Sequence, residues 1–203
     1  MKLGIVIPFR NRKDHLAQSA PILKQFGHVY VVEQMDDKPF NRGKLANVAF
    51  NEFKKEFDYF AFHDVDLIPE DANYAYTENP CHLATMVEEY GYKMPYDEYF
   101  GGVTLFPNDK FEKVNGFSNL MYGWSAEDDF IRRRFVEMNI PLQSRQCKFT
   151  SLHHIRVVDR ELRAANVKIL RAPIEWGDGL TSCQYEVVHC EDLENYTLLQ
   201  VRL

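Results

Sequence analysis

The sequence predicts an α/β fold, in which a Rossmann-like, mostly parallel sheet is flanked by helices. Two observations lead to this class. In the first third of the chain, short apolar runs alternate with longer segments of helical periodicity. The order strand, helix, strand, helix, strand gives parallel strands with helices on both faces. With 203 residues, of which 45% are hydrophobic, the chain can form one sizeable core. We therefore expect residues 1–203 to be a single domain.

Local signals set the limits of the first elements. The run from Leu3 to Ile7 is apolar and is closed by Pro8, as expected of a buried strand. Gly27 ends a helical stretch, and Asn41 is a suitable N-cap for the next helix. In order, we expect a strand at 3–7, a helix at 15–26, a strand at 29–32, a helix at 42–57 and a strand at 59–63.

The pattern is looser in the rest of the chain. Residues 72–97 mix tyrosine, asparagine, proline and glycine, and we expect them to wrap over a site. Asn108 is a suitable helix cap, and the triplet Arg132-Arg133-Arg134 indicates a solvated helix face with salt bridges. We expect a strand at 100–106, helices at 109–114, 127–138 and 161–170, a strand at 148–152, and late strands at 184–188 and 197–201 that form a small C-terminal antiparallel element.

Composition and charge exclude several kinds of protein. The net charge of −6 argues against a nucleic-acid partner, which usually requires a basic face. The apolar start is too short for a signal peptide, and no run approaches the ~18–20 apolar residues of a membrane span. We therefore expect a cytoplasmic protein with no transmembrane segment. None of the four cysteines forms a C-x-x-C pair, which argues against a zinc site. In a cytosolic chain free thiols are expected, and one disulfide is the alternative for a secreted protein.

Two carboxylates follow the third expected strand. Asp64 and Asp66 would point the same way in an extended chain, and together they can hold one divalent cation. The end of a strand is where open α/β sheets bind ligands; a solvated turn is the alternative. His154 offers a nitrogen ligand, while the neighbouring His153 would face the opposite side of a strand. Mn²⁺ or Mg²⁺ accepts such ligands.

Two arginine-containing segments fall at the same expected edge. Arg10 and Arg12 follow the first strand, and Phe9 offers a flat face to a nucleotide base. Phe40 and Arg42 open a helix, whose N–H groups add partial positive charge. Ordinary polar helix starts are the alternative for each segment, but the shared location favours a ligand that contains phosphate.

Residues 123–129 place an aromatic side chain next to carboxylates. Trp124 can stack on the apolar face of a sugar ring. Asp128 can accept a hydroxyl proton as a general base, and Glu127 can hold another hydroxyl of the acceptor. The alternative is an ordinary helix start, with Ser125 as its cap and the acids in its first turn.

Taken in order, these segments resemble the β-1,4-galactosyltransferase family, glycosyltransferase family 7, which has the GT-A fold. The resemblance implies a metal-dependent enzyme that transfers galactose from UDP-galactose, with inversion, to an acceptor hydroxyl. That hydroxyl is often the 4-OH of N-acetylglucosamine, which gives a β-1,4 linkage. The lack of an anchor and stem fits a bacterial or viral member. The matching segments are IPFRNR at 7–12, FNRGKLANVAF at 40–50, HDVDLIP at 63–69, YFGGV at 99–103, NGFSN at 115–119, YGWSAEDD at 122–129 and GLTS-x-x-Y at 179–185.

The same resemblance implies a role for each matching residue. Asp66 and His154 would hold Mn²⁺, or Mg²⁺ in its place, with His153 or water as a third ligand. Asp128 would be the catalytic base. The acceptor would be bound by Trp124, Glu127 and Asp128, and the donor UDP-galactose by Pro8, Phe9, Arg10, Arg12, Phe40, Arg42, Val65, Asp66, Tyr99, Gly102, Trp124 and His154.

Some positions depart from the family pattern. Ser125 and Ala126 replace the Gly-Gly that the family often has beside Trp124, so the hinge of a mobile lid would differ. Ser151 stands where many members have a metal-binding methionine. Tyr99 favours UDP-galactose over UDP-N-acetylgalactosamine. A different UDP-sugar donor, a non-catalytic sugar-binding relative and a metal-dependent phosphohydrolase remain as alternatives, and the acceptor is open.

Overall fold

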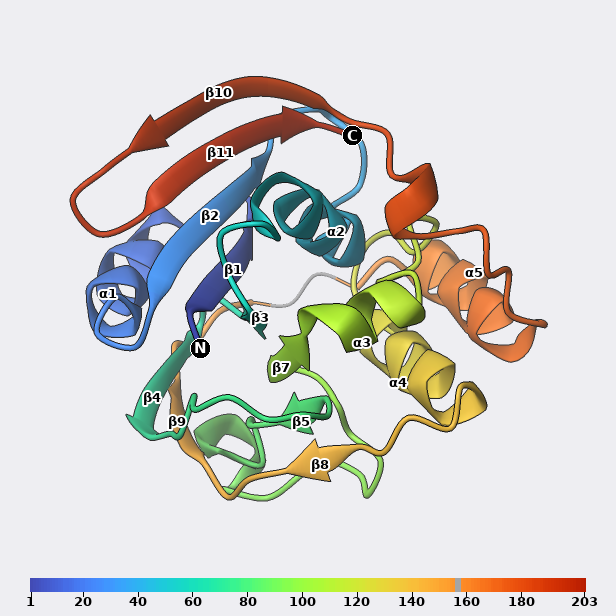
Figure 1. Ribbon diagram of the computed structural model, residues 1–203, viewed down its shortest axis with the longest axis horizontal. Coiled ribbons are helices and arrows are strands. Elements are labelled where there is room, and N and C mark those ends of the chain that lie inside the picture. The colour runs from blue at the N-terminus through green and yellow to red at the C-terminus, as the bar shows by residue number, and fades with distance from the viewer. Residues whose placement is uncertain (156–157) are drawn as a thin grey trace.

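The computed structural model describes residues 1–155 and 158–203 as two sheets surrounded by helices (Figure 1). The larger sheet has eight strands in the order β10-β11-β2-β1-β3-β7-β5-β8. These strands are β1 (Leu3–Phe9), β2 (His28–Gln34), β3 (Tyr59–His63), β5 (Cys81–His82), β7 (Val103–Pro107), β8 (Gln143–Ser144), β10 (Glu186–Asp192) and β11 (Thr197–Arg202). The smaller sheet has the order β4-β9-β6 and consists of β4 (Leu67–Asp71), β6 (Met86–Val87) and β9 (Lys148–Ser151).

Five α-helices and two short 3-10 helices complete the described part of the chain. Their order along the chain agrees with the predicted alternation of helix and strand in the first third. The elements are α1 (Lys13–Leu23), α2 (Arg42–Phe53), η1 (Glu88–Tyr90), α3 (Asn108–Lys113), α4 (Glu127–Glu137), α5 (Arg160–Arg171) and η2 (Leu180–Ser182).

The centre of the larger sheet is parallel, as predicted. Strands β11, β2, β1 and β3 pair in parallel, and β7 then runs antiparallel to β3. The predicted C-terminal hairpin is confirmed, because β10 pairs antiparallel with β11. The hairpin is not a separate element, however. It extends the main sheet through β11, and Figure 1 shows β10 at the outer edge.

Alternation along β1 explains why helices cover both faces of this sheet. Ile5 and Ile7 pack into the cluster that contains the apolar residues of α1, whereas Val6 packs into the cluster that contains α2. Successive side chains of a strand point to opposite faces. A strand that is apolar at every position can therefore serve two cores at once, which is the signature of a parallel sheet with two covered faces.

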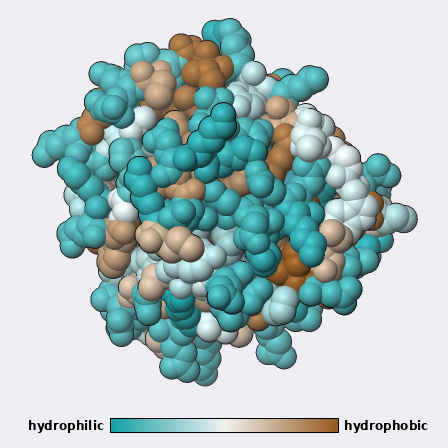
Figure 2. All heavy atoms as spheres, in the orientation of Figure 1, coloured by the Kyte–Doolittle hydropathy of each residue, from teal (hydrophilic) through white to brown (hydrophobic). Residues whose placement is uncertain are grey.

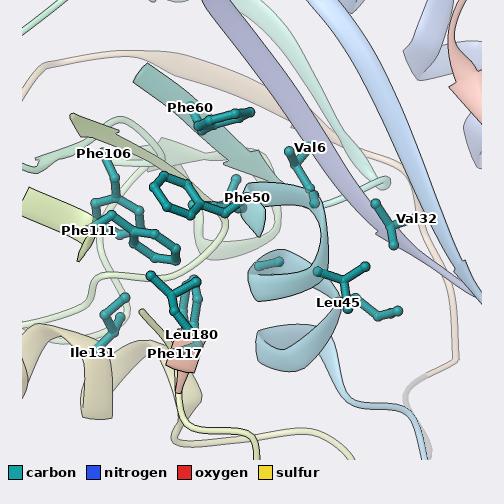
Figure 3. Close-up of a cluster of buried hydrophobic side chains, with 14 of the residues drawn as sticks. Val6, Val32, Leu45, Phe50, Phe60, Phe106, Phe111, Phe117, Ile131 and Leu180 are labelled. Carbon is teal, nitrogen blue, oxygen red and sulfur yellow. The ribbon is translucent and has the colours of Figure 1, made fainter. Parts of the chain in front are cut away.

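The core on the α2 side is rich in phenylalanines (Figure 3). Phe62 and Phe106 come from β3 and β7, and Phe111 from α3 packs between their rings with centroid distances of 5.0 and 5.4 Å. Phe50 of α2 lies 4.8 Å from Phe111 in the same measure. Aromatic packing thus joins two strands to two helices directly behind the carboxyl end of β3.

Several boundaries differ from those predicted. Helix α2 ends at Phe53 and not at residue 57. The strand predicted at 100–106 begins at Val103, because Gly102 has a φ of +78°, which interrupts an extended chain. Asn108 does not cap α3. It is the first residue of that helix, and its amide donates to the carbonyls of Lys54 and Phe57.

The predicted solvated face of α4 is wrong for one of its three arginines. Arg132 and Arg133 lie on the surface, but Arg134 is fully buried. Its guanidinium donates to the carbonyls of Gly116 and Asp178, each at 2.7 Å. A helix of 3.6 residues per turn directs three consecutive side chains over about 200°, so a run of three cannot share one face.

The smaller sheet positions part of the site, and only its strand β9 was expected, which confirms the strand predicted at 148–152. Strand β4 pairs antiparallel with β9, and β9 pairs in parallel with β6, which lies inside residues 72–97, the segment predicted to be a loop. This pairing brings the chain after Ser151 beside the turn that follows β3. Figure 1 shows β4 and β9 side by side at the lower left.

Figure 2 shows one side of the molecule, where hydrophilic residues predominate and hydrophobic ones form small separate patches. Within residues 1–155 and 158–203, no helix has the length and apolar character that crossing a bilayer requires. The thiols of Cys81, Cys147, Cys183 and Cys190 are free, as predicted.

Candidate active site

A cavity of about 610 Å³ lies at the carboxyl ends of β1 and β3, next to the first turn of α2. This edge is where parallel α/β sheets bind their ligands. Segments that are far apart in the sequence meet there. Of the residues predicted for a site, the cavity is lined by Pro8, Arg10, Arg12, Phe40, Arg42, Val65, Asp66, Trp124, Glu127 and His154.

Five predicted residues, Phe9, Tyr99, Gly102, Asp128 and His153, are not among those that line the cavity. Phe9 is buried in the core on the α1 side, because it alternates with Pro8 and Arg10, which line the cavity. Its ring offers no open face for a base. His153 is exposed, while the adjacent His154 lines the cavity.

Asp66 and His154 form a close pair. Nδ1 of His154 lies 3.0 Å from Oδ2 of Asp66, and both side chains are more than four-fifths buried, with exposures of 17% and 18%. The backbone N–H of Leu152 donates to the carbonyl of Asp66 at 2.8 Å, which ties the end of β9 to the turn after β3. A carboxylate oxygen beside an imidazole nitrogen is a ligand pair that Mn²⁺ accepts.

The rest of a metal coordination sphere does not come from clustered acidic, histidine or cysteine side chains. Among the described residues, no group of three or more such side chains is placed to hold an ion. Ser151, at the position of the family's methionine, instead accepts a hydrogen bond from the backbone of Glu89 at 3.2 Å. Phosphate and water oxygens are the remaining ligand sources.

Asp64 does not point to the same place as Asp66. The chain turns at this point, with Leu67 N–H donating to the Asp64 carbonyl, so the extended geometry assumed from the sequence does not apply. The Asp64 carboxylate accepts a hydrogen bond of 2.7 Å from Nε of Arg42. The predicted convergence of Asp64 and Asp66 on one ion is therefore wrong.

Arg42 connects this turn to the acidic start of α4. Its Nη1 lies 2.7 Å from Oδ1 of Asp128, and the residue is only 9% exposed. Nη2 is buried and has no hydrogen-bond partner among the described residues. Burial alone would lower the pKa of Arg42, but Asp128 and Asp64 outweigh it and raise that pKa.

The two acids at the start of α4 have perturbed pKa values. Burial raises the pKa of Asp128 well above its usual value, Arg42 opposes this, and the nearby Glu127 and Asp64 add to it. Burial likewise raises the pKa of Glu127, again against the effect of Arg42. Carboxyl groups with raised pKa values in a cleft are typical of acid–base chemistry.

The loop before α4 has a strained backbone on either side of Trp124. Gly123, Ser125 and Ala126 have φ values of +77°, +129° and +73°. Ser125 does not cap α4, as one reading of the sequence suggested. Ala126 is the N-cap residue and makes no side-chain cap. Non-glycine residues in this region cost of order 1–3 kcal/mol each and require surrounding contacts to hold them.

A buried asparagine on α5 supplies such contacts. Asn166 donates to the carbonyl of Tyr122 at 2.9 Å and to that of Ser125 at 3.0 Å. The guanidinium of Arg163 lies over the Trp124 ring, 5.9 Å from its centroid. The Trp124 side chain remains 48% exposed. No periodicity or motif identified Asn166, because its role depends on how α5 packs.

Tyr99 and the two glycines that follow it lie behind the acidic cluster. A methyl group on Gly101 would come 2.8 Å from Oδ2 of Asp128 and from the Tyr99 ring. The N–H of Asp64 donates to the carbonyl of Gly102 at 3.0 Å. The glycines therefore allow Asp64, Tyr99 and Asp128 to approach one another closely.

Fold and site together define the class of this protein as a GT-A glycosyltransferase-type domain. Two solved structures of the Drosophila β1,4-galactosyltransferase 7 catalytic domain share the fold over 100% of this chain and 94% of theirs. One, in complex with xylobiose, has a TM-score of 0.88 at 26% identity. The other is a mutant in complex with manganese, UDP-Gal and xylobiose, with a TM-score of 0.83 at 25% identity.

The chain belongs to glycosyl transferase group 7. Residues 1–79 match the N-terminal region of glycosyl transferase group 7, and residues 81–157 match a model described as the N-terminal domain of galactosyltransferase. Human β-1,4-galactosyltransferase 4 is 41% identical over 94% of this chain and 60% of its own length. Mouse β-1,4-galactosyltransferase 1 is 35% identical over 98% of this chain and 54% of its own. The chain thus spans little more than half of these relatives.

Proposed function

We propose that this protein is an inverting, metal-dependent galactosyltransferase that moves galactose from UDP-galactose to a hydroxyl of a carbohydrate acceptor. The observation that carries the proposal is the position of Arg42. It lines the same cavity as Asp66 and His154, and it is paired with both Asp64 and Asp128. The candidate base thus lies one ion pair away from the cavity in which the nucleotide would bind.

The nucleotide would lie along the first turns after β1 and before α2. Arg10 and Arg12 line the cavity and offer planar, charged donors to phosphate oxygens. The guanidinium of Arg10 lies 5.5 Å from the Phe40 ring centroid, so a cation and an aromatic face are presented together. This combination suits a nucleoside diphosphate.

Asp66 and His154 would hold Mn²⁺, since their 3.0 Å contact already places oxygen and nitrogen ligands on the same spot. When bound, the ion would supply Lewis-acid stabilisation of negative charge on the diphosphate. The structural neighbour that contains manganese and UDP-Gal supports this choice of ion and donor.

Asp128 would act as the general base. Its raised pKa makes it a better proton acceptor than an ordinary aspartate, and the contact with Arg42 favours its ionised form. It would take the proton of the acceptor hydroxyl as that oxygen bonds to the anomeric carbon. The bond from that carbon to the diphosphate would break, and UDP would leave with the electron pair.

The acceptor would lie between Trp124 and the first turn of α4. The exposed indole can stack on a sugar ring, and the Glu127 carboxylate can accept a hydrogen bond from a second acceptor hydroxyl. The relatives named β-1,4-galactosyltransferase support transfer to a 4-OH, as on N-acetylglucosamine, whereas the Drosophila structures contain xylobiose. Both acceptor classes therefore belong in the test.

The test combines the protein with Mn²⁺, UDP-galactose and either an N-acetylglucosamine or a xylose β-glycoside, and reads the product linkage by NMR. A β-linked galactoside supports the proposal. Release of galactose that is faster without acceptor would instead indicate a hydrolase. Tight binding of both ligands with no product would indicate a sugar-binding relative. Cytoplasmic location and a bacterial or viral origin stay predictions.

A further inference from the structure

The outer face of α5 carries positive charge that the proposed mechanism does not use. Four of the twelve residues of this helix are cationic and one is acidic, although the whole chain has a net charge of −6. The helix packs on α4 and lies at the outer right in Figure 1. Within residues 160–171, all of which the structure describes, only Asn166 is buried. Most of the helix is therefore available to a ligand.

The cations of α5 have no acidic partners. Among the described residues, none of the four forms an ion pair or a side-chain hydrogen bond; they are Arg160, Arg163, Lys168 and Arg171. Elsewhere on the surface, Lys54, Arg132 and Lys148 each pair with a glutamate at 2.6 to 2.9 Å. A cationic strip that is left unpaired in an acidic protein attracts anions from solution.

A second hollow, of about 690 Å³, lies along this face of the helix. Residues three, four and seven positions apart share one side of a helix, so Arg160 lies in one stripe with the next three lining residues. The hollow thus combines two guanidinium groups with an apolar floor. Its lining residues are Val158, Arg160, Arg163, Ala164 and Val167.

The position of the two arginines in the helix also favours an anion. Arg160 is the first residue of α5, and Arg163 comes at the end of its first turn. The N-terminal end of a helix carries partial positive charge, so cations are less favourable there than at the other end. The cap residue Asp159 accepts from the N–H groups of Glu161 and Leu162 at 2.9 and 3.0 Å. An anion bound between the arginines would relieve the remaining repulsion.

This hollow lies beside the part of the cavity where the acceptor would bind. The guanidinium of Arg163 lies 5.9 Å from the centroid of the Trp124 ring, and Trp124 lines the main cavity. Asn166 of the same helix donates to the carbonyls of Tyr122 and Ser125, on either side of that loop. A group attached to a sugar on Trp124 can therefore reach α5.

We propose that the outer face of α5 binds the aglycone of the acceptor, and that this aglycone is a diphosphate joined to an apolar chain. Arg160 and Arg163 would donate to the phosphate oxygens, for which planar guanidinium groups are suited. The chain would lie on the apolar floor of the hollow. The inference rests on the proposed function, since it names the chemical class of its acceptor. A neutral glycan would use neither feature.

Two acceptors that differ only in the diphosphate test this assignment. One is the decyl diphosphate of the sugar that the transfer assay identifies, N-acetylglucosamine or xylose, and the other is the neutral decyl glycoside. We expect wild type to show a kcat/KM about tenfold or more higher for the diphosphate, because hydrogen bonds to charged groups are the stronger ones. The advantage should shrink as the salt concentration rises, since the groups are near the surface.

Arg160→Gln should lower the ratio of kcat/KM for the diphosphate acceptor to that for the neutral one by about tenfold. Arg202→Gln is the matched control, because it removes a 58% exposed arginine on β11 and changes the net charge by the same amount. It should leave the ratio unchanged. Circular dichroism checks that both variants are folded. A merely structural role of Arg160 would lower kcat/KM for both acceptors equally.

The inference is overturned if wild type uses the two acceptors equally well, or if the ratio in Arg160→Gln stays within twofold of wild type. Binding to phosphatidylglycerol vesicles that is lost in Arg160→Gln, with an unchanged acceptor ratio, would also overturn it and indicate a membrane contact. If wild type forms no galactoside, the proposed function fails. Calorimetric binding of decyl diphosphate to wild type and Arg160→Gln then still tests the face of α5.

Discussion

Arg42 Nη1 lies 2.7 Å from Oδ1 of Asp128, so a buried cation faces the candidate base directly. Burial and neighbouring acids favour the protonated form of that base, while Arg42 favours the charged form. The net effect raises the pKa of Asp128, so this group holds an accepted proton more tightly than a carboxylate in water does.

Asp128→Asn removes the proton acceptor and should retain UDP binding. We expect the transfer rate to fall by ~10²–10⁴-fold, the usual contribution of a general base. Steady-state transfer assays and calorimetric binding of Mn²⁺·UDP would measure the two properties. Asp109→Asn, on the exposed side of α3, is the control. Near-normal transfer by Asp128→Asn would show that another group takes the proton.

Arg42→Gln should change the pH dependence of transfer. Arg42 lowers the pKa of Asp128, so its removal should raise that pKa further. The base works in its ionised form, and activity should therefore be lost at a higher pH than in wild type. A profile of kcat/KM against pH measures the acidic limb. An unchanged limb would mean that Asp128 does not titrate in this range.

His154→Ala should weaken binding of Mn²⁺·UDP, whereas His153→Ala should leave it nearly unchanged. Only His154 pairs with Asp66, and His153 is exposed. We expect a loss of at least ~10-fold in affinity for the first variant, the lower end of what perturbing metal ligation costs. Calorimetry with UDP alone and with UDP plus Mn²⁺ separates the metal contribution. Equal losses in both variants would contradict the assignment.

Asn166→Ala should release the Trp124 loop. The substitution removes two hydrogen bonds, each worth about 1 kcal/mol, from a loop that contains unfavourable φ values. We expect acrylamide to quench Trp124 fluorescence more strongly. We also expect more hydrolysis of UDP-galactose relative to transfer, because a loop that closes over the donor excludes water. The exposed Lys168→Ala on the same helix is the control. Unchanged quenching would mean that the hydrogen bonds of Asn166 do not hold the Trp124 loop in place.

Arg134→Met should destabilise the fold much more than Arg132→Met. Arg134 is fully buried and holds several carbonyls, so its loss should cost about 3–5 kcal/mol in the free energy of unfolding. Arg132 forms an exposed ion pair with Glu98 at 2.9 Å, worth under about 1 kcal/mol. Urea denaturation followed by circular dichroism measures both. Equal effects would mean that the network around Arg134 is dispensable.

Features that depend on local chain properties could be predicted from the sequence. The apolar runs of β1 and β3, and the cap of α2 by Asn41, whose side chain accepts from the N–H of Lys44 at 2.8 Å, follow from periodicity and short-range hydrogen bonding. The order of motifs likewise placed Arg10, Arg42 and Asp66 at one sheet edge. That edge follows from chain direction in a parallel sheet.

Other features depend on which distant segments meet, and these only the tertiary structure decided. The small sheet delivers His154 to Asp66, the turn at Asp64 sends its carboxylate to Arg42, and the packing of α5 places Asn166 against the Trp124 loop. The physical reason is that local patterns determine the direction of the backbone at each residue. The partner of a buried charge is instead selected by long-range packing, because a buried charge must be paired wherever the fold allows.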